Sequence, residues 1–335
     1  MDEPTPRDGV PETALGWHRA GRGAAIATVV ETWGSAPRRA GSLMAVSGEM
    51  ELAGSVSGGC VEGAVAEEAL DAIATGRPRM LEYGVSDGDA FAVGLACGGT
   101  IRVLLESVAA MGEARLAELV RLRAAHVPAV YTVDVERWER AVHAGPGLPP
   151  DLAERAAADR TGADGARVSV VHNPPLRMAI VGGVHIAQAL AGMAALAGFD
   201  VTVIDPRAAF ASAARFPGTA IDTAWPDAAM GAFAPDGRSA VVTLTHDPKL
   251  DDPALHVALR SEAFYVGALG SRRTNASRAE RLRAAGFGEE ALARVHGPVG
   301  LDIGAATPGE IAAAILAEAI ACLRGRGAAA GRAAT

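Results

Sequence analysis

Residues 180–187 read Ile-Val-Gly-Gly-Val-His-Ile-Ala and lie between a predicted strand and a predicted helix. Arg177–Val181 is a short apolar run typical of a buried strand, and His185–Gly198 has the apolar spacing of a helix. Val201–Ile204 is a second apolar run, and it ends at Asp205, about twenty residues beyond the glycines. A strand, a glycine turn, a helix and a second strand that ends in an acidic residue predict a Rossmann-type βαβ unit.

The glycines of this turn depart from the dinucleotide-binding pattern G-x-G-x-x-G/A. With Gly182 as the first glycine of the pattern, Val184 occupies the second position and Ala187 the third. Alanine is accepted at the third position, but a valine side chain at the second obstructs the approach of a pyrophosphate to the backbone. Two interpretations therefore stay open. One is the same fold without a nucleotide, and the other is an NAD(P) site built from Gly182, Gly183, His185 and Asp205.

Strands and helices continue to alternate toward the C-terminus, which predicts a doubly wound parallel sheet with helices on both faces. Ligands of such sheets bind at the carboxyl ends of the strands. The further predicted elements are strands at Ser239–Thr245 and Ala263–Leu269 and helices at Pro253–Ser261, Thr274–Ala285 and Pro308–Arg324.

Two polar motifs follow strands of this sheet. The first contains His246, which is a candidate general acid or base, although a helix-capping role explains His246 and Asp247 equally well. The second is Gly270-Ser271-Arg272-Arg273. Arg272 is a candidate phosphate ligand, and the alternative is the solvated first turn of a helix.

The first half of the chain has a different pattern. Residues 1–125 mix predicted strands, such as Ala24–Thr32, with alanine-rich helical segments, such as Val61–Thr75. We therefore expect an α/β protein with a mixed α/β domain at 1–125, a connecting region at 126–175 and a Rossmann-like domain at 176–335. The sequence Asn173-Pro174-Pro175 is the expected joint.

Two short loops of the first half each place a cysteine beside two glycines. Ser57-Gly58-Gly59-Cys60 precedes a predicted helix, whose positive end stabilises a thiolate, while its glycine N–H groups can approach an anion. Cys97-Gly98-Gly99 repeats this composition. The two loops could converge on one anionic ligand that carries a soft metal. The alternative is a buried cysteine beside a structural turn.

A third loop of the first half is rich in arginine. Gly34–Gly41 contains Arg38 and Arg39, whose guanidinium groups suit phosphate or carboxylate recognition. A solvated turn is the other interpretation.

Composition excludes several classes of protein. The 335 residues carry a formal net charge of −8, which disfavours a nucleic-acid surface. Lys249 is the one lysine, and no GxxxxGK[ST] string occurs. Three widely spaced cysteines form no disulfide framework and match no zinc pattern. No signal peptide or membrane span is expected. Together with the absence of a disulfide framework, this makes the reducing cytoplasm the expected compartment.

Taken together, these strings resemble the XdhC/CoxI family from about Ala24 to Cys322. In the first half the resemblance rests on GSAPRRAG at Gly34–Gly41, SGGCVE at Ser57–Glu62 and CGG at Cys97–Gly99. In the second half it rests on THD at Thr245–Asp247, YVGALGSRR at Tyr265–Arg273, GLDIG at Gly300–Gly304 and TPGEI at Thr307–Ile311. Val184 departs from this family, in which glycine is common at that position.

The resemblance implies a maturation factor for molybdenum hydroxylases such as xanthine dehydrogenase. Such a factor binds the molybdenum cofactor, assists its sulfuration and delivers it to the apoenzyme, with a cysteine desulfurase as a further partner. It implies a chaperone without turnover, in which Cys60 and Cys97 contact molybdenum. The phosphate or pterin would be held by Arg38, Ser57, Gly58, Gly59, Gly98 and Gly99.

Two other functions remain open. An NAD(P)-dependent oxidoreductase would use the Rossmann half, and a scaffold would dock a desulfurase and an apoenzyme without a cofactor. The alanine-rich helices also suggest a homodimer.

Overall fold

The computed structural model describes residues 9–36, 38–84 and 99–325, and it divides the chain into two compact units. Unit 1 is Met1–Pro174 and unit 2 is Pro175–Thr335, so the division falls inside Asn173-Pro174-Pro175. Among the described residues, none of the helices combines the length and apolarity needed to cross a membrane.

Unit 1 begins with a five-stranded antiparallel sheet of order β3-β2-β1-β5-β4. Its central strand β1 is buried on both faces. Ala24, Ile26 and Val30 belong to a core cluster with α1 and α4, whereas Ala25, Ala27 and Val29 belong to another cluster with α2. The elements are α1 (Val10–Arg19), β1 (Ala24–Trp33), β2 (Leu43–Ser47), β3 (Leu52–Gly54), α2 (Glu62–Thr75), β4 (Arg79–Tyr83), β5 (Thr100–Ser107), α3 (Val108–Met111) and α4 (Glu113–Ala124).

The residues expected to connect the two domains instead form a second antiparallel sheet of unit 1, of order β7-β6-β9-β8. Tyr131, Val133, Val168 and Val170 belong to the same core cluster as α1 and α4, so this sheet shares the core of unit 1. The elements are β6 (Ala129–Asp134), β7 (Arg140–Ala144), a short 3₁₀ turn (Gly145–Gly147), α5 (Pro150–Ala157), β8 (Gly162–Asp164) and β9 (Arg167–His172).

Unit 2 is the predicted doubly wound parallel sheet, with strand order β12-β11-β10-β13-β14-β15. The strands are β10 (Leu176–Val181), β11 (Phe199–Ile204), β12 (Ala220–Asp222), β13 (Ser239–Thr243), β14 (Tyr265–Ala268) and β15 (Val295–His296). The order reverses between β10 and β13, the usual position of a ligand in this fold.

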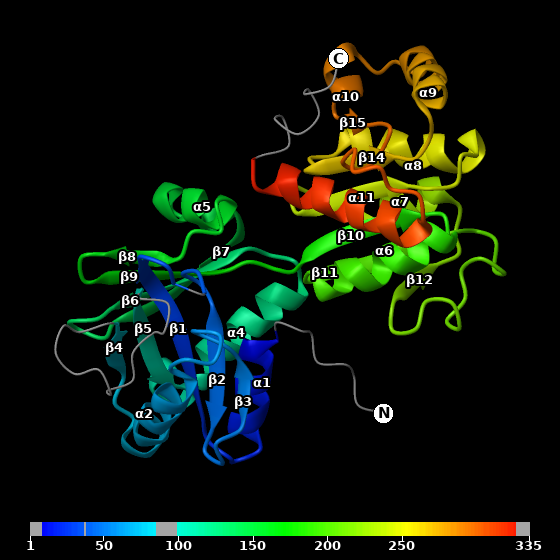
Figure 1. Cartoon of the computed structure of the whole chain (residues 1–335). Coiled ribbons are helices and arrows are strands. Elements are labelled where there is room, and N and C mark those ends of the chain that lie inside the picture. The colour runs from blue at the N-terminus through cyan, green and yellow to red at the C-terminus, as the bar shows by residue number, and fades with distance from the viewer. Residues whose placement is uncertain (1–8, 37, 85–98, 326–335) are drawn as a thin grey trace. The chain divides into compact units, whose positions relative to one another are not determined.

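Helices cover both faces of this sheet. One core cluster joins the sheet to α6 (His185–Leu196) and α11 (Pro308–Leu323), which lie side by side (Figure 1). The other cluster joins it to α7 (Pro226–Phe233), α8 (Pro248–Arg260), α9 (Arg272–Ala284) and α10 (Glu289–Ala293). Met178 and Ile180 of β10 face the first cluster, and Ala179 and Val181 face the second, which explains the uninterrupted apolar run of this strand.

Helix α8 starts at Pro248, earlier than the predicted Pro253. Asp247 is the N-cap, because its side chain accepts a hydrogen bond from the backbone of Lys249. Proline suits the first helical position, where its missing N–H group costs no hydrogen bond. The helix therefore gains a turn and carries Pro253 inside it.

Candidate functional site

The loop at residues 34–41 and the residue that precedes β5 meet at one end of the first sheet of unit 1. Trp33 at the end of β1 pairs with Thr100 at the start of β5. A Cβ atom on Gly99 would lie 2.9 Å from the backbone nitrogen of Ala36, so glycine permits this close contact. Two of the segments singled out by the sequence are therefore neighbours.

The Ser57–Cys60 turn lies at the same end of this sheet. β3 ends at Gly54, which pairs with Met44 near the start of β2, and the turn follows directly. Val56 and Val61 flank the turn, and both belong to the core cluster against which Ala36 packs. Cys97 and Gly98 lie outside the described residues.

The Ser57–Cys60 turn is organised around Glu62, in the first turn of α2. Its Oε1 accepts hydrogen bonds from the backbone nitrogens of Val56, Ser57 and Gly58, at 3.1, 2.8 and 3.0 Å. The Ser55 hydroxyl donates to the same oxygen at 2.6 Å. The other oxygen, Oε2, accepts from the Gly59 nitrogen at 2.8 Å and from the Ser57 hydroxyl.

This bonding explains the acidity of Glu62. Partial burial acts to raise its pKa, but the hydrogen bonds from Ser55 and Ser57 and from the backbone lower it to about 2. The carboxylate is therefore ionised at neutral pH. Gly58 and Gly59 were expected to bind a phosphate through their N–H groups, and in this structure those groups bind the chain's own carboxylate. Glu62 was not assigned to the site from the sequence, and an acidic residue directly after a glycine turn is the signal that points to it.

Cys60 lies at the exposed tip of this turn. Its thiol is free and exposed, two residues before the first residue of α2. Ser57 is buried, and its Oγ accepts hydrogen bonds from the backbone nitrogens of Cys60 and Val61, at 3.0 and 2.9 Å. The hydroxyl and the Glu62 carboxylate thus fix the backbone that presents the thiol. An exposed thiol at the positive end of a helix suits a soft metal ligand.

Arg38 and Arg39 supply positive charge near this end of the sheet. Both are exposed, and within residues 9–36, 38–84 and 99–325 neither guanidinium group forms an ion pair. Two such guanidinium groups are available to an anion such as a phosphate.

At the carboxyl edge of the sheet of unit 2, the glycine turn after β10 meets the loop after β13. Gly182 has a φ of +107°, and a Cβ atom there would lie 2.5 Å from Thr245 Cγ2. A Cβ atom on Gly183 would lie 2.5 Å from the carbonyl oxygen of Phe210. Both glycines therefore allow close packing within the protein itself.

Asp205 is a candidate ligand in the NAD(P) interpretation, but its carboxylate is engaged by the protein itself. Oδ1 accepts from Arg207 Nε at 2.8 Å, and Oδ2 accepts from Arg207 Nη2 at 2.7 Å and from the Gly183 nitrogen at 2.9 Å. The Asp205 side chain is inaccessible to solvent. Burial acts to raise its pKa, but the hydrogen bonds from Arg207 and Gly183 hold it below the usual range. Its observed role is to tie the glycine turn to the loop after β11.

The remaining predicted residues of unit 2 are exposed around the same edge. His246 has a φ of +61° and lies in the loop after β13, while Asp247 performs the capping role. His185 and Arg272 are the exposed first residues of α6 and α9. Val184 is the N-cap of α6, and its side chain makes no capping hydrogen bond.

A buried ion pair supports this edge. Arg278 of α9 and Asp251 of α8 are 2% and 1% exposed, and Arg278 Nη2 lies 3.3 Å from Asp251 Oδ2. Thr245 donates its hydroxyl hydrogen to Asp251 Oδ1 at 2.6 Å, and Arg278 Nη2 donates to the Leu269 carbonyl oxygen at 2.9 Å. The pair thus connects the loop after β13 to the loop after β14. Sequence reasoning did not identify it, because its members are widely separated in the chain.

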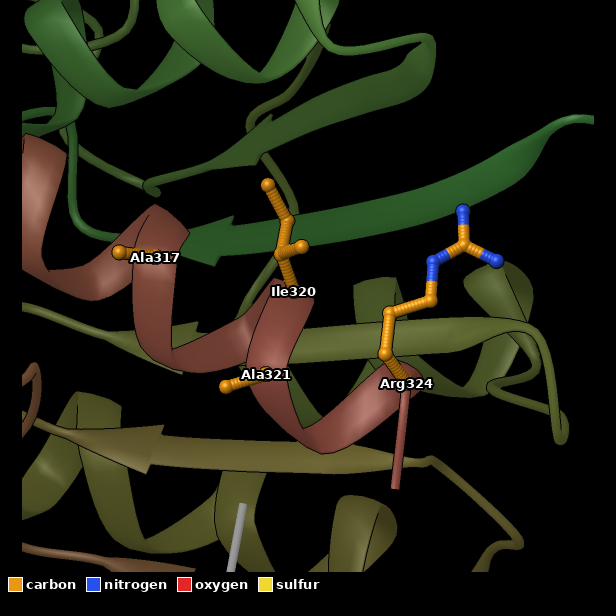
Figure 2. Close-up of a pocket in the computed structure, with 4 residues that line it drawn as sticks. All are labelled: Ala317, Ile320, Ala321 and Arg324. Carbon is orange, nitrogen blue, oxygen red and sulfur yellow. The ribbon is translucent and has the colours of Figure 1, made fainter. Parts of the chain in front are cut away.

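A surface hollow of about 490 Å³ lies elsewhere in unit 2, on α11 (Figure 2). It is lined by Ala317, Ile320, Ala321 and Arg324. Arg324 is the one charged lining residue, and none of the four is a predicted site residue. Ligand pockets usually combine an apolar lining with a few convergent polar groups. This hollow has one polar side chain, so the loops described above are the better candidates.

The two units define an α/β protein that combines a doubly wound Rossmann unit with a thiol on a glycine turn. The chain belongs to the XdhC and CoxI family. The model of that family matches residues 17–84, and the model of the XdhC Rossmann domain matches residues 178–319.

Two curated relatives extend over most of the chain. The "Molybdenum cofactor insertion chaperone PaoD" of Escherichia coli K12 is 33% identical over 89% of this chain and 83% of its own length. A protein of Bacillus subtilis 168 that is named a probable subunit of xanthine dehydrogenase is 30% identical over 89% of this chain and 92% of its own length. A crystal structure described as a xanthine dehydrogenase from Bacillus halodurans has the same fold, with a TM-score of 0.75 over 94% of this chain and 96% of that one, at 24% identity.

Proposed function

We propose that this protein binds the molybdenum cofactor, assists its sulfuration and delivers it to a molybdenum hydroxylase of the xanthine dehydrogenase type. The cofactor is cargo in this scheme, and the protein is a chaperone without turnover. A cysteine desulfurase and the apoenzyme are its partners, and the cytoplasm is its compartment.

One structural observation carries the proposal. The Cys60 thiol is exposed on a turn whose backbone is held by Ser57 and Glu62. Family membership supplies the context, because the relative from Escherichia coli is named a molybdenum cofactor insertion chaperone. A thiolate is a suitable ligand for a soft metal centre.

The residues of unit 1 suggest how the cargo would be held. Cys60 would contact the molybdenum centre, and Cys97 of the string Cys97-Gly98-Gly99 would add a second thiolate. Gly58 and Gly59 donate to Glu62, so a phosphate would depend on other groups. Arg38 and Arg39 are exposed and fit that role.

The geometry of Asp205 argues against the alternative of an NAD(P)-dependent oxidoreductase. Its carboxylate accepts from Arg207 and Gly183, so it would have to leave both partners to bind a ribose hydroxyl. A titration with NADH that detects binding at micromolar concentration would restore that alternative.

The test of the proposal is cofactor retention. The protein and its Cys60→Ala variant are purified from a host that makes molybdenum cofactor, and bound pterin is measured as its fluorescent oxidation product. We expect Cys60→Ala to bind the cofactor at least about 10-fold more weakly than the wild type. A 10-fold change in the dissociation constant corresponds to roughly 1.4 kcal/mol, and the loss of a metal–sulfur bond should cost more than that.

Cys322→Ala is the matched control, since it also removes a free thiol but lies in unit 2. It should retain the wild-type amount of pterin. Equal pterin in the wild type and in Cys60→Ala would remove Cys60 from the proposed site, and absence of pterin from the wild type would contradict the chaperone function.

A further inference from the structure

A second thiol site lies in unit 2, where the end of α11 meets β15. Cys322 near the end of α11 has its Sγ 3.6 Å from His296 Nε2. The other ring nitrogen of His296, Nδ1, lies 3.2 Å from Glu318 Oε1. The thiol thus contacts the imidazole, and the imidazole contacts the carboxylate. This is the arrangement of a nucleophile, its general base and the group that orients the base.

Glu318 is itself firmly oriented. Its Oε2 accepts from the Tyr265 hydroxyl at 2.6 Å and from the Gly300 nitrogen at 2.8 Å. Burial acts to raise its pKa, but the hydrogen bonds from His296, Tyr265 and Gly300 keep it below the usual range. An ionised Glu318 favours the tautomer of His296 that carries its proton on Nδ1, which leaves the Nε2 lone pair facing the thiol.

The thiol needs this base. Burial and the charge of Glu318 raise the pKa of Cys322, so the sulfur keeps its proton at neutral pH. The titratable groups around it are His296 of β15, Tyr265 of β14 and Glu318 of α11 itself. Helix α6, which packs along α11, contributes apolar residues to the shared core cluster: Ala187, Leu190, Ala191 and Ala194.

We propose that Cys322 is a nucleophile for divalent sulfur, with His296 as its general base and Glu318 as the residue that orients the base. The substrate class is a small molecule with an S–S bond, either a disulfide or a persulfide. Cys322 is a free thiol in a half-buried residue.

The step is an exchange without net oxidation. The Cys322 sulfur attacks one sulfur of the S–S bond while His296 Nε2 takes the thiol proton. A new S–S bond joins Cys322 to the attacked sulfur, the old S–S bond breaks, and the departing thiolate receives the proton from His296. With a disulfide, Cys322 ends in a mixed disulfide. With a persulfide attacked at its terminal sulfur, Cys322 ends as a persulfide.

The test uses the full chain with Cys60→Ala and Cys97→Ala, which leaves Cys322 as the one thiol. Reaction with an aromatic disulfide that releases a coloured thiolate gives the rate as a function of pH. We expect His296→Gln to lower the rate at neutral pH at least about 10-fold, because general-base assistance contributes roughly 10²–10⁴-fold. The remaining rate should rise at the higher pH at which the thiol itself ionises.

Glu318→Gln is the second variant, and it keeps an oxygen that can accept from Tyr265 and Gly300. It should lower the rate less than His296→Gln does, and circular dichroism checks that both variants fold. The matched control is the Cys97→Ala, Cys322→Ala chain, in which Cys60 should react equally fast with or without His296→Gln. An unchanged rate and pH profile in folded His296→Gln would overturn the proposal.

Two further arms identify the natural source of sulfur. The same Cys322-only chain is incubated with oxidised glutathione or with glutathione persulfide, and its intact mass is measured. Addition of a glutathionyl group supports a disulfide substrate, and addition of one sulfur atom supports a persulfide. An unmodified chain in both arms would contradict the proposal.

Discussion

Glu62 concentrates an unusual number of hydrogen bonds on one side chain. Its carboxylate serves the backbone nitrogens of Val56, Ser57, Gly58 and Gly59, in addition to two serine hydroxyls. Gly58 and Gly59 adopt φ values of +78° and +117°, which turn these nitrogens toward one point. A buried N–H group without a partner is costly, and Val56 and Ser57 are buried. Glu62, together with the Ser57 hydroxyl, therefore holds the shape of the turn.

Replacement of Glu62 should therefore destabilise unit 1. We expect Glu62→Gln to lower the free energy of unfolding by about 1.5–3 kcal/mol, because hydrogen bonds to a charged acceptor are replaced by weaker ones. The measurement is urea unfolding followed by tryptophan fluorescence, since Trp17, Trp33 and Trp138 all lie in unit 1. Glu67→Gln, at an exposed position of α2, is the control and should be neutral. Equal stability of the two variants would contradict this role of Glu62.

His172 of β9 should make unit 1 sensitive to acid. It is fully buried, and desolvation, with the charge of Arg123, lowers its pKa from 6.5 to about 3. The folded protein keeps His172 neutral while the unfolded chain protonates it, so its contribution to stability is present above pH 6.5 and is lost as pH falls toward 3. At pH 5 the loss is about 2 kcal/mol.

The effect of His172 can be isolated by substitution. The free energy of unfolding of His172→Phe, measured between pH 7 and pH 5, should fall by about 2 kcal/mol less than that of the wild type. His185→Gln removes an exposed imidazole and should keep the wild-type slope. A wild-type slope in His172→Phe would show that other groups cause the acid sensitivity.

At the scale of elements, helices α8 and α9 fix the two loops that follow β13 and β14 at the carboxyl edge of unit 2. Asp251 at the start of α8 and Arg278 in α9 form a buried pair, to which Thr245 and the Leu269 carbonyl oxygen also bind. Buried charges are stable only while they are paired. The positions of the loops after β13 and β14 are thereby coupled.

Loss of Arg278 should unfold this edge. Arg278→Met leaves the Asp251 charge buried without its partner, and we expect a loss of about 3–5 kcal/mol in the free energy of unfolding. Arg281 lies on the same helix as Arg278 and forms a more exposed ion pair with Asp252 of α8. Arg281→Met should therefore lower the free energy of unfolding by about 1 kcal/mol or less. Calorimetry of both variants tests the difference, and similar transition temperatures would show that the buried pair contributes little.

The fold of unit 2 could be predicted because β10 is buried on both faces and is followed directly by a glycine turn and a helix. The second sheet of unit 1 could be predicted only in part. Its strands β6 and β9 are apolar runs that read as strands, whereas β7 is half-buried throughout and β8 has three residues, so neither of these two was predicted. Neither strand shows a clear alternation of apolar and polar residues.

The candidate site was predicted in part. The position of Cys60 at a helix start follows from the glycines and the alanine-rich run after them. The partners of Gly58 and Asp205 do not follow, because they depend on how the backbone turns at Gly59 and Gly182, both of which have positive φ values. A glycine in the sequence shows that such a turn is allowed. It does not show which oxygen atom will accept a hydrogen bond from the backbone nitrogens of the turn.

The whole molecule consists of two units with separate cores. Among the residues that the structure describes, three hydrophobic clusters are built from unit 1 and two from unit 2. The expected homodimer stays a prediction, for which the exposed Leu196 and Ile320 are the residues to mutate first.

Separate cores predict separate unfolding. We expect tryptophan fluorescence, which mainly reports unit 1, and circular dichroism at helical wavelengths, which reports both units, to give transitions that do not coincide in urea. His172→Phe should shift the fluorescence transition alone, and Arg278→Met should shift the remaining part of the dichroism change. Coincident transitions in both variants would show that the two units unfold as one.

The hydrogen bonds of Glu62 have a further consequence for the thermodynamics of ligand capture. A loop that must become ordered on binding loses roughly 1–2 kcal/mol of backbone entropy per residue. The turn that carries Cys60 is already ordered by its internal carboxylate, so its rigidity precedes any encounter with cargo. Under the proposed function, this preorganisation contributes to the affinity at Cys60. Calorimetric titration with the cofactor should then find a less unfavourable entropy of binding in the wild type than in Glu62→Gln.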